Sequence, residues 1–175
     1  MLLKWNKMNP GTTSLKTEIR CLLAFFIIAL VLSGATAIPV ETELTFVTPL
    51  LSPDSALAKL FSKVLQAAHS TNQTFPFLMY GYDWLAFAHF VIAVAFIGPF
   101  INPVKNIWVI EFGMIACLMI IPFALIVAGF RGLPVWWRLI DCSFGVIGFI
   151  PLWFCRKKIL KLEKLLAADR LNLIF

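Results

Sequence analysis

The sequence predicts an all-α membrane protein: an antiparallel bundle of four transmembrane helices, with one extracytoplasmic amphipathic helix and a basic C-terminal helix. Of its 175 residues, 61% are hydrophobic and 14% are charged, whereas about a quarter of the residues in a soluble domain are charged. The mean hydropathy is +0.90. The apolar residues gather in four runs, at about 21–40, 84–100, 107–130 and 134–155. A run of roughly 20 residues, at about 1.5 Å each, crosses the hydrocarbon core of a bilayer.

Residues 1–20 form a polar segment, predicted to be cytoplasmic, that carries four basic residues. The first apolar run follows it, and we expect this run to be a retained transmembrane helix. The alternative is a cleaved secretory signal, in which Ala35-Thr36-Ala37 would form the cleavage site. Whether residues 21–37 are removed stays open at this point.

An amphipathic helix is predicted at about 53–69, in the segment between the first two spans. Ser52 is a suitable N-cap, Pro53 suits the first turn, and Asp54 places an acid at the positive end of the helix dipole. Apolar residues then recur at helical spacing on one face, and polar residues occupy the other. The apolar positions are Leu57, Leu60, Phe61, Val64, Leu65 and Ala68, and the polar positions are Lys59, Ser62, Lys63 and Gln66. This helix is too short and too polar to span a bilayer, so we expect it on the membrane surface, with a loop after it at 70–76.

The last three spans are joined by connections of a few residues, which makes consecutive helices antiparallel neighbours. Residues 156–175 form a basic amphipathic tail with apolar positions that include Ile159, Leu162 and Leu173. We expect the tail to continue from the fourth span and to settle among the lipid headgroups, where each basic residue near anionic lipid contributes about 1 kcal/mol.

The distribution of Lys and Arg predicts the orientation of the bundle. Four basic residues lie in 1–20, one (Lys105) lies between the second and third spans, and six lie in the tail. The opposite side holds only Lys59, Lys63 and Arg131. The positive-inside rule therefore places both termini in the cytoplasm and residues 41–83 outside.

The candidate functional residues are four ionisable groups at membrane depth: His89, Glu111, Arg138 and Asp141. Charges there are costly, and they persist mainly where they are paired or used. On the predicted topology, His89 lies about 9 Å along the second helix from the outside, while Arg138 and Asp141 lie about 6 and 10 Å along the fourth. We expect these three to meet at a similar outer level, with Arg138 and Asp141 sharing a face at spacing i, i+3.

Two further expectations concern the surroundings of these groups. The stripe that holds Asp141 continues through Gly145, Gly148 and Leu152, and its small residues allow close helix contact, so this face should point into the bundle. Glu111 lies on the inner side, about 6 Å into the third helix, within reach of Lys105 or Arg156.

Composition and motifs argue against several classes of function. No basic stripe with interleaved aromatics exists outside the apolar runs, which disfavours nucleic-acid binding. The four cysteines have neither CxxC spacing nor histidine neighbours, so no metal site and no disulfide is predicted. No nucleophile motif identifies a catalytic residue, and the sequence specifies no cofactor.

The segments YGYDWLAFAHFVIA, FIGPFINPVKNIWVIEFGMIAC and VWWRLIDCSFG, between Tyr80 and Cys155, resemble a group of uncharacterised bacterial four-span inner-membrane proteins. The resemblance implies a bacterial source and an inner-membrane location. The group has no assigned activity, so the resemblance implies no catalytic or binding residue.

We therefore expect a non-enzymatic integral membrane protein. It would bind a lipid or small lipophile in an outer polar pocket, or serve as an accessory subunit of a membrane complex; the predicted partners are the lipid bilayer, a bound lipid or lipophile, and a larger complex or homo-oligomer. One alternative is a small intramembrane acid–base enzyme, isomerase-like, acting on a lipophilic substrate through Asp141 and His89. Another is an ion or proton pathway formed by an oligomer.

Overall fold

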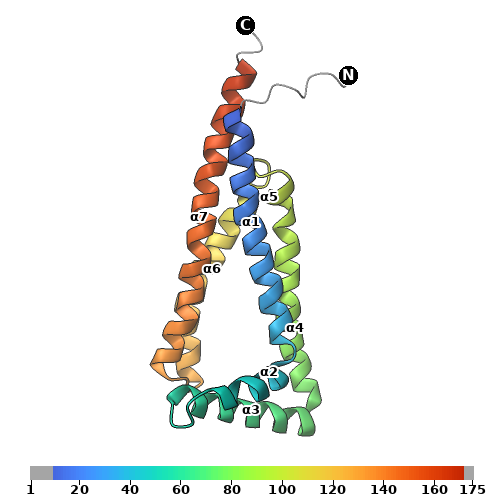
Figure 1. Cartoon of the computed structure of the whole chain (residues 1–175), viewed down its shortest axis with the longest axis vertical. Helices are drawn as coiled ribbons and strands as arrows, with labels where there is room; N and C mark the ends of the chain where they lie inside the picture. Colours follow the sequence, from blue (N-terminus) through green and yellow to red (C-terminus); the bar gives the residue numbers. More distant parts are fainter. Residues whose placement is uncertain (1–9, 172–175) are drawn as a thin grey trace. The chain divides into compact units, whose positions relative to one another are not determined.

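The computed structural model describes residues 10–171, and that part of the chain is helical, with no strand in it. Lys4, Lys7 and Leu173, which entered the predictions for the two ends, lie outside the described residues. The elements run in the order α1 (Pro10–Ala37), α2 (Val40–Val47), the 3₁₀ helix η1 (Thr48–Leu50), α3 (Ala56–Thr74), α4 (Pro76–Ala95), α5 (Ile97–Ile101), α6 (Ile107–Phe130) and α7 (Val135–Leu171) (Figure 1).

Four of the described helical stretches are long and apolar enough to cross a membrane: Gly11–Ala37, Pro76–Ile101, Ile107–Phe130 and Val135–Leu171. The chain is thus a multi-pass membrane protein, as predicted. The third span has the predicted bounds. The second begins at Pro76, eight residues earlier than predicted, because no loop separates α3 from α4 beyond a break at Phe75.

The described chain divides into two compact units. The first unit contains residues up to Ile27 together with Ala95–Phe175, and the second contains Ile28–Val94. Each unit is taken by itself below.

In the first unit, α6 and α7 form a hairpin around Gly132, whose φ of 71° is in the left-handed region where glycine is favoured. The two helices lie side by side (Figure 1). They approach closely at glycines: a Cβ added to Gly145 would lie 2.5 Å from the carbonyl oxygen of Cys117, and one added to Gly148 would lie 2.9 Å from its Sγ. The prediction that this face of the fourth span points at protein is confirmed at Gly145 and Leu152, which are buried.

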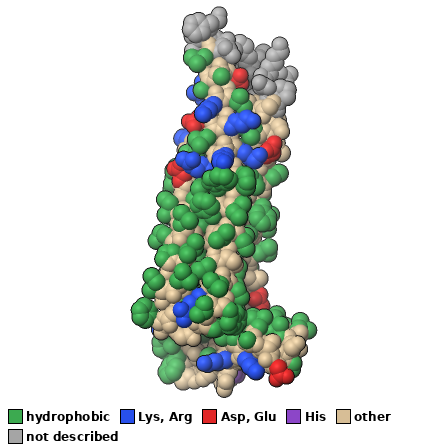
Figure 2. Space-filling view, turned by 90° about the vertical axis from the view of Figure 1, so that its left-hand side faces the viewer, with side chains coloured by type: hydrophobic (Ala, Val, Ile, Leu, Met, Phe, Trp, Pro, Cys, Tyr) green, Lys and Arg blue, Asp and Glu red, His purple; other side chains and the backbone are tan. Residues whose placement is uncertain are grey.

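The basic tail continues α7 without a break to Leu171, as predicted, and its place among the lipid headgroups stays a prediction. Its apolar residues Ile159 and Leu162 are fully buried, and Lys158 donates a hydrogen bond to Glu18 of α1. These two apolar residues of the tail are therefore covered by protein and are not available to lipid. Figure 2 shows the charged side chains gathered around this part of α7.

The N-terminal half of α1 provides the partner surface. Residues 10–20, part of the predicted polar segment, are helical, with Thr12, Leu15, Ile19 and Leu23 buried at helical spacing. The polar segment and the first span therefore share one helix, because a polar segment with one apolar stripe forms a stable helix when that stripe is covered; where the span begins within it stays a prediction.

The second unit contains the C-terminal part of α1, then α2, η1, α3 and most of α4. α1 and α4 come close at Gly34, where an added Cβ would lie 2.8 Å from the carbonyl oxygen of Ala86 and 3.0 Å from Cβ of His89. The predicted amphipathic helix is present as α3, but it runs from Ala56 to Thr74, and its N-cap is Ser55, whose Oγ accepts from the amide of Ala58 at 3.1 Å. Ser52 instead provides its carbonyl to the amide of Ser55, so Ser52 as N-cap was wrong.

Candidate functional site

Arg138 is held at the start of α7 by the backbone. The amides of Trp137 and Arg138 both donate to the carbonyl of Pro134, which leaves the carbonyl of Leu133 without a helical donor. Arg138 Nε donates to that oxygen at 2.9 Å. Its Nη1 lies 3.0 Å from the position a Cβ of Gly129 would take, so the absence of a side chain at Gly129 makes room for the guanidinium.

Asp141 lies one turn further along α7 and is half-buried. Within residues 10–171, its carboxylate has neither a hydrogen-bond partner nor an ion-pair partner, and the pair with Arg138 that the i, i+3 spacing suggested is not formed. The Leu133 carbonyl takes the place that Asp141 was expected to fill. Next to Asp141, the thiol of Cys142 donates to the carbonyl of Ile121 in α6 at 3.8 Å, so α7 is already packed at this level.

The depth of Asp141 follows from the charged residue that ends the apolar part of α7. Arg156 lies fifteen residues after Asp141 on the same helix, which corresponds to about 22 Å. In a hydrocarbon core of about 30 Å, a carboxylate at that distance from one boundary lies well below the other. Asp141 is thus a half-buried acid without a partner in residues 10–171, and its position at membrane depth stays a prediction.

Glu111 belongs to a different interaction at the other end of the hairpin. Arg156 Nε donates to Glu111 Oε1 at 2.9 Å, which confirms that one of the two predicted partners reaches it. The two side chains are 42% and 39% exposed, so the pair is partly solvated and joins α6 to α7.

His89 lies on α4, in the second unit. Its Nδ1 is 3.0 Å from the carbonyl of Leu85, one turn back on the same helix. Because only a protonated ring nitrogen can donate to a carbonyl, Nδ1 carries the proton, and Nε2 is an acceptor in the neutral ring. The meeting of His89 with Arg138 and Asp141 stays a prediction.

Polar groups that sequence analysis did not select occur in the second unit. Nδ1 of His69 in α3 lies 3.1 Å from Oε2 of Glu41 in α2, and Nε2 of His69 lies 2.9 Å from the amide nitrogen of Gln73. Identifying this connection from sequence required knowing that residues 40–47 form a helix, which the sequence analysis did not predict. The i, i+4 spacing of His69 and Gln73 was the one signal in the sequence.

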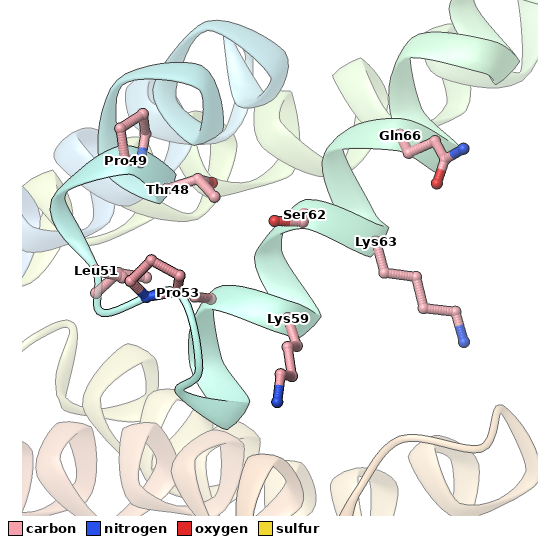
Figure 3. Close-up of a pocket in the computed structure, with 9 residues that line it drawn as sticks. Thr48, Pro49, Leu51, Pro53, Lys59, Ser62, Lys63 and Gln66 are labelled. Atoms are coloured by element: carbon pink, nitrogen blue, oxygen red, sulfur yellow. The ribbon is translucent and has the colours of Figure 1, made fainter.

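A groove of about 500 Å³ lies between η1 and α3 in the same unit (Figure 3). Thr48, Pro49 and Leu51 contribute one side, and Lys59, Ser62 and Lys63 contribute the other. The hydroxyl oxygen of Thr48 is buried and has no hydrogen-bond partner in the described part of the chain. Among residues 10–171, no group of three or more His, Cys, Asp or Glu side chains could hold a metal ion.

The fold and these sites define a small, all-helical, multi-pass membrane protein. Comparisons of the chain with protein-family models, with characterised proteins and with solved structures found no match.

Proposed function

We propose that this protein is a non-enzymatic integral membrane protein that serves as an accessory subunit of a membrane complex, and that Asp141 is the centre of its subunit contact. The observation that carries the proposal is the half-buried carboxylate of Asp141, which has no partner in residues 10–171 and is predicted to lie at membrane depth. Ionisable groups at such positions usually pair with one another or with backbone groups. A cationic side chain on a helix of another subunit would supply the missing partner.

The state of Arg138 favours this function over the polar lipid pocket. Nε of Arg138 is used by the Leu133 carbonyl, which leaves only its Nη donors for a lipid phosphate at this level. The side chain is also folded back toward Gly129 of the same hairpin. Arg138 therefore stabilises the turn between α6 and α7, while Asp141 keeps all of its acceptor capacity.

The rigid contact between α6 and α7 supports the same function. Backbone approach at Gly145, the Cys142 hydrogen bond and the Glu111–Arg156 pair fix the hairpin at three levels. Most of its remaining surface is exposed and apolar, and large side chains such as Phe123 and Phe144 are 66% and 62% exposed. Such a surface is equally suited to lipid tails and to a neighbouring helix, so the acid is what would select a protein partner.

As to location, we propose a bacterial inner membrane with both termini in the cytoplasm. This rests on the resemblance given above and on the excess of Lys and Arg in residues 1–20 and 156–175.

The test is native mass spectrometry of the full-length protein extracted in a mild detergent from cells that express it. Asp141→Asn removes the charge at constant size, and Asp141→Glu keeps it. Asp169→Asn, in the C-terminal part of α7, is the matched control because it removes an acid from the same helix outside its apolar part. We expect a bound protein subunit to remain on the chain when the detergent is removed in the mass spectrometer, for the wild type and for Asp141→Glu and Asp169→Asn. Asp141→Asn should appear as the chain alone.

The thermal unfolding midpoint of the isolated chain should not fall in Asp141→Asn, because the carboxylate has no partner within residues 10–171 to lose and because removing an unpaired charge also removes the cost of burying it. A complex that survives Asp141→Asn, or a wild-type chain that binds no subunit in its native membrane, would refute the proposal. The mass of the released subunit distinguishes a second copy of this chain from a different protein.

A further inference from the structure

The groove in the second unit has the chemistry of an anion site. Lys59 and Lys63 lie one helical turn apart on α3, and both line the groove. Neither ammonium has a carboxylate within 4.0 Å in the described part of the chain, where the second unit's one ion pair is Glu41–His69. The positive charge of the two lysines is therefore not neutralised by neighbours.

Hydroxyl groups complete the polar part of the groove. In Figure 3, the side chains of Thr48 and Ser62 point toward one another from η1 and α3. The Thr48 hydroxyl is buried without a partner among residues 10–171, and burying a polar group without a hydrogen bond costs about 1–3 kcal/mol on protein scales. An oxyanion in the groove would accept from this hydroxyl, and remove that cost, once the Thr48 side chain turns its shielded hydroxyl toward the groove.

The groove also has an apolar part, and its place in the chain brings it to the membrane surface. Pro49, Leu51 and Pro53 form apolar walls. Residues 38–75 connect α1 to α4, and both of these helices are spans, so this segment emerges from and returns to the same face of the bilayer. Close to the groove, Phe46 and Leu50 are 72% and 82% exposed, as expected for residues that contact lipid.

We propose that this groove binds the phosphate of an anionic phospholipid, with Lys59 and Lys63 on the phosphate oxygens, the Thr48 and Ser62 hydroxyls as further donors, and the proline-lined walls against the glycerol and upper acyl carbons. Ammonium and hydroxyl groups are suitable donors for a phosphodiester because hydrogen bonds to a charged acceptor are about twice as strong as neutral ones. The proposal is independent of the subunit contact at Asp141, because it uses residues of the second unit only.

The experiment uses the full-length protein in neutral detergent micelles, titrated with short-chain phosphatidylglycerol and observed by native mass spectrometry and by the ³¹P chemical shift of the lipid. Short-chain phosphatidylcholine, with the same chains and no net charge, is the lipid control. Glycerol phosphate is the soluble phosphate control. The variants are Lys59→Gln/Lys63→Gln and Thr48→Val, and the matched control is Lys161→Gln/Lys164→Gln, which removes the same charge from α7.

We expect phosphatidylglycerol to bind the wild type in preference to phosphatidylcholine. At about 1 kcal/mol per basic residue near anionic lipid, each lysine contributes about fivefold to the affinity, so Lys59→Gln/Lys63→Gln should weaken binding about 30-fold. Thr48→Val should weaken binding with unchanged circular dichroism, and Lys161→Gln/Lys164→Gln should bind as the wild type does.

Equal loss in the Lys161→Gln/Lys164→Gln control would mean that binding follows net charge and would overturn the site. Equal binding of phosphatidylcholine, or full binding by Lys59→Gln/Lys63→Gln, would overturn it as well. If glycerol phosphate binds as tightly as the lipid, the proposal that the ligand is a membrane phospholipid would be overturned, and the groove would be a site for a soluble phosphate ester. Because Lys59 and Lys63 are both exposed, their replacement leaves the packing of α3 intact.

Discussion

The contact between α6 and α7 yields a prediction about two glycines. An added Cβ would clash with a backbone atom at Gly145 and with a side-chain atom at Gly148. A Cβ on Gly145 would lie 2.5 Å from the carbonyl oxygen of Cys117, whereas 3.4 Å is the lower limit of ordinary contact. Gly145→Ala thus requires the helices to separate by about 1 Å, and overpacking of this kind costs about 1–3 kcal/mol. The helix propensity of alanine returns at most about 1 kcal/mol, so the net effect is destabilising.

Gly148→Ala meets the same residue of α6 through a different atom. Its Cβ would lie 2.9 Å from Sγ of Cys117, and the next neighbour, Cε2 of Phe26, is at 3.7 Å. Cys117→Ala deletes the sulfur but keeps the carbonyl. We therefore expect Cys117→Ala to relieve the cost of Gly148→Ala by about 1 kcal/mol and to leave the cost of Gly145→Ala unchanged, because the carbonyl that opposes Gly145 is still present.

The assay is reversible unfolding in mixed micelles, with the free energy of unfolding measured for each single and double variant. Gly81→Ala in α4 is the control, because a Cβ there would have no neighbour within 4 Å. It should be neutral or slightly stabilising. If Gly145→Ala were as well tolerated as Gly81→Ala, or if Cys117→Ala rescued it, the close approach of the two backbones would be refuted.

Two further predictions concern local stability. Ser55→Ala should cost about 1 kcal/mol of α3 stability because the Ser55 hydroxyl accepts from the Ala58 amide. Hydrogen exchange of the first turn of α3 measures this, and Ser52→Ala, the control, should have no effect. Equal protection in the two variants would contradict the assignment of Ser55 as the N-cap. The Glu111–Arg156 pair, with both side chains more than a third exposed, should show a coupling below about 1 kcal/mol in a double-mutant cycle of Glu111→Gln and Arg156→Gln. A coupling of several kcal/mol would mean that the pair is buried in the assembled protein.

Strong local signals made the third span predictable from the sequence. Ile107–Phe130 is bounded by Asn102-Pro103 before it and by Gly132 and Pro134 after it, and its bounds are those predicted. The pairing of Glu111 was also predictable, because Arg156 ends the apolar part of the next, antiparallel helix. In both cases the decisive information lies within a few residues or follows from the hairpin connection.

The features that were missed depend on a partner surface. The apolar stripe of α1 that contains Leu15 and Ile19 is sparse, and it forms a helix where α7 covers it, as the Glu18–Lys158 hydrogen bond indicates. The same packing keeps Ile159 off the lipid. The N-cap of α3 was misplaced because Ser52-Pro53-Asp54 and Ser55 both satisfy capping preferences, and only the hydrogen bond to Ala58 decides between them.

The expected Arg138–Asp141 pair failed for a related reason, and its failure gives Asp141 its significance. Spacing i, i+3 permits the pair, but the start of α7 leaves the Leu133 carbonyl free, and Arg138 Nε donates to that carbonyl and not to the Asp141 carboxylate. Three of the four predicted residues have a partner in the described chain. His89 contacts a carbonyl of its own helix, Glu111 pairs with the neighbouring helix, and Arg138 donates to the turn before its helix. A buried network serving only to fix the bundle would satisfy all four. An acid left unpaired by its own chain at membrane depth costs several kcal/mol unless another molecule pairs with it, and native mass spectrometry of Asp141→Asn is therefore the most informative experiment.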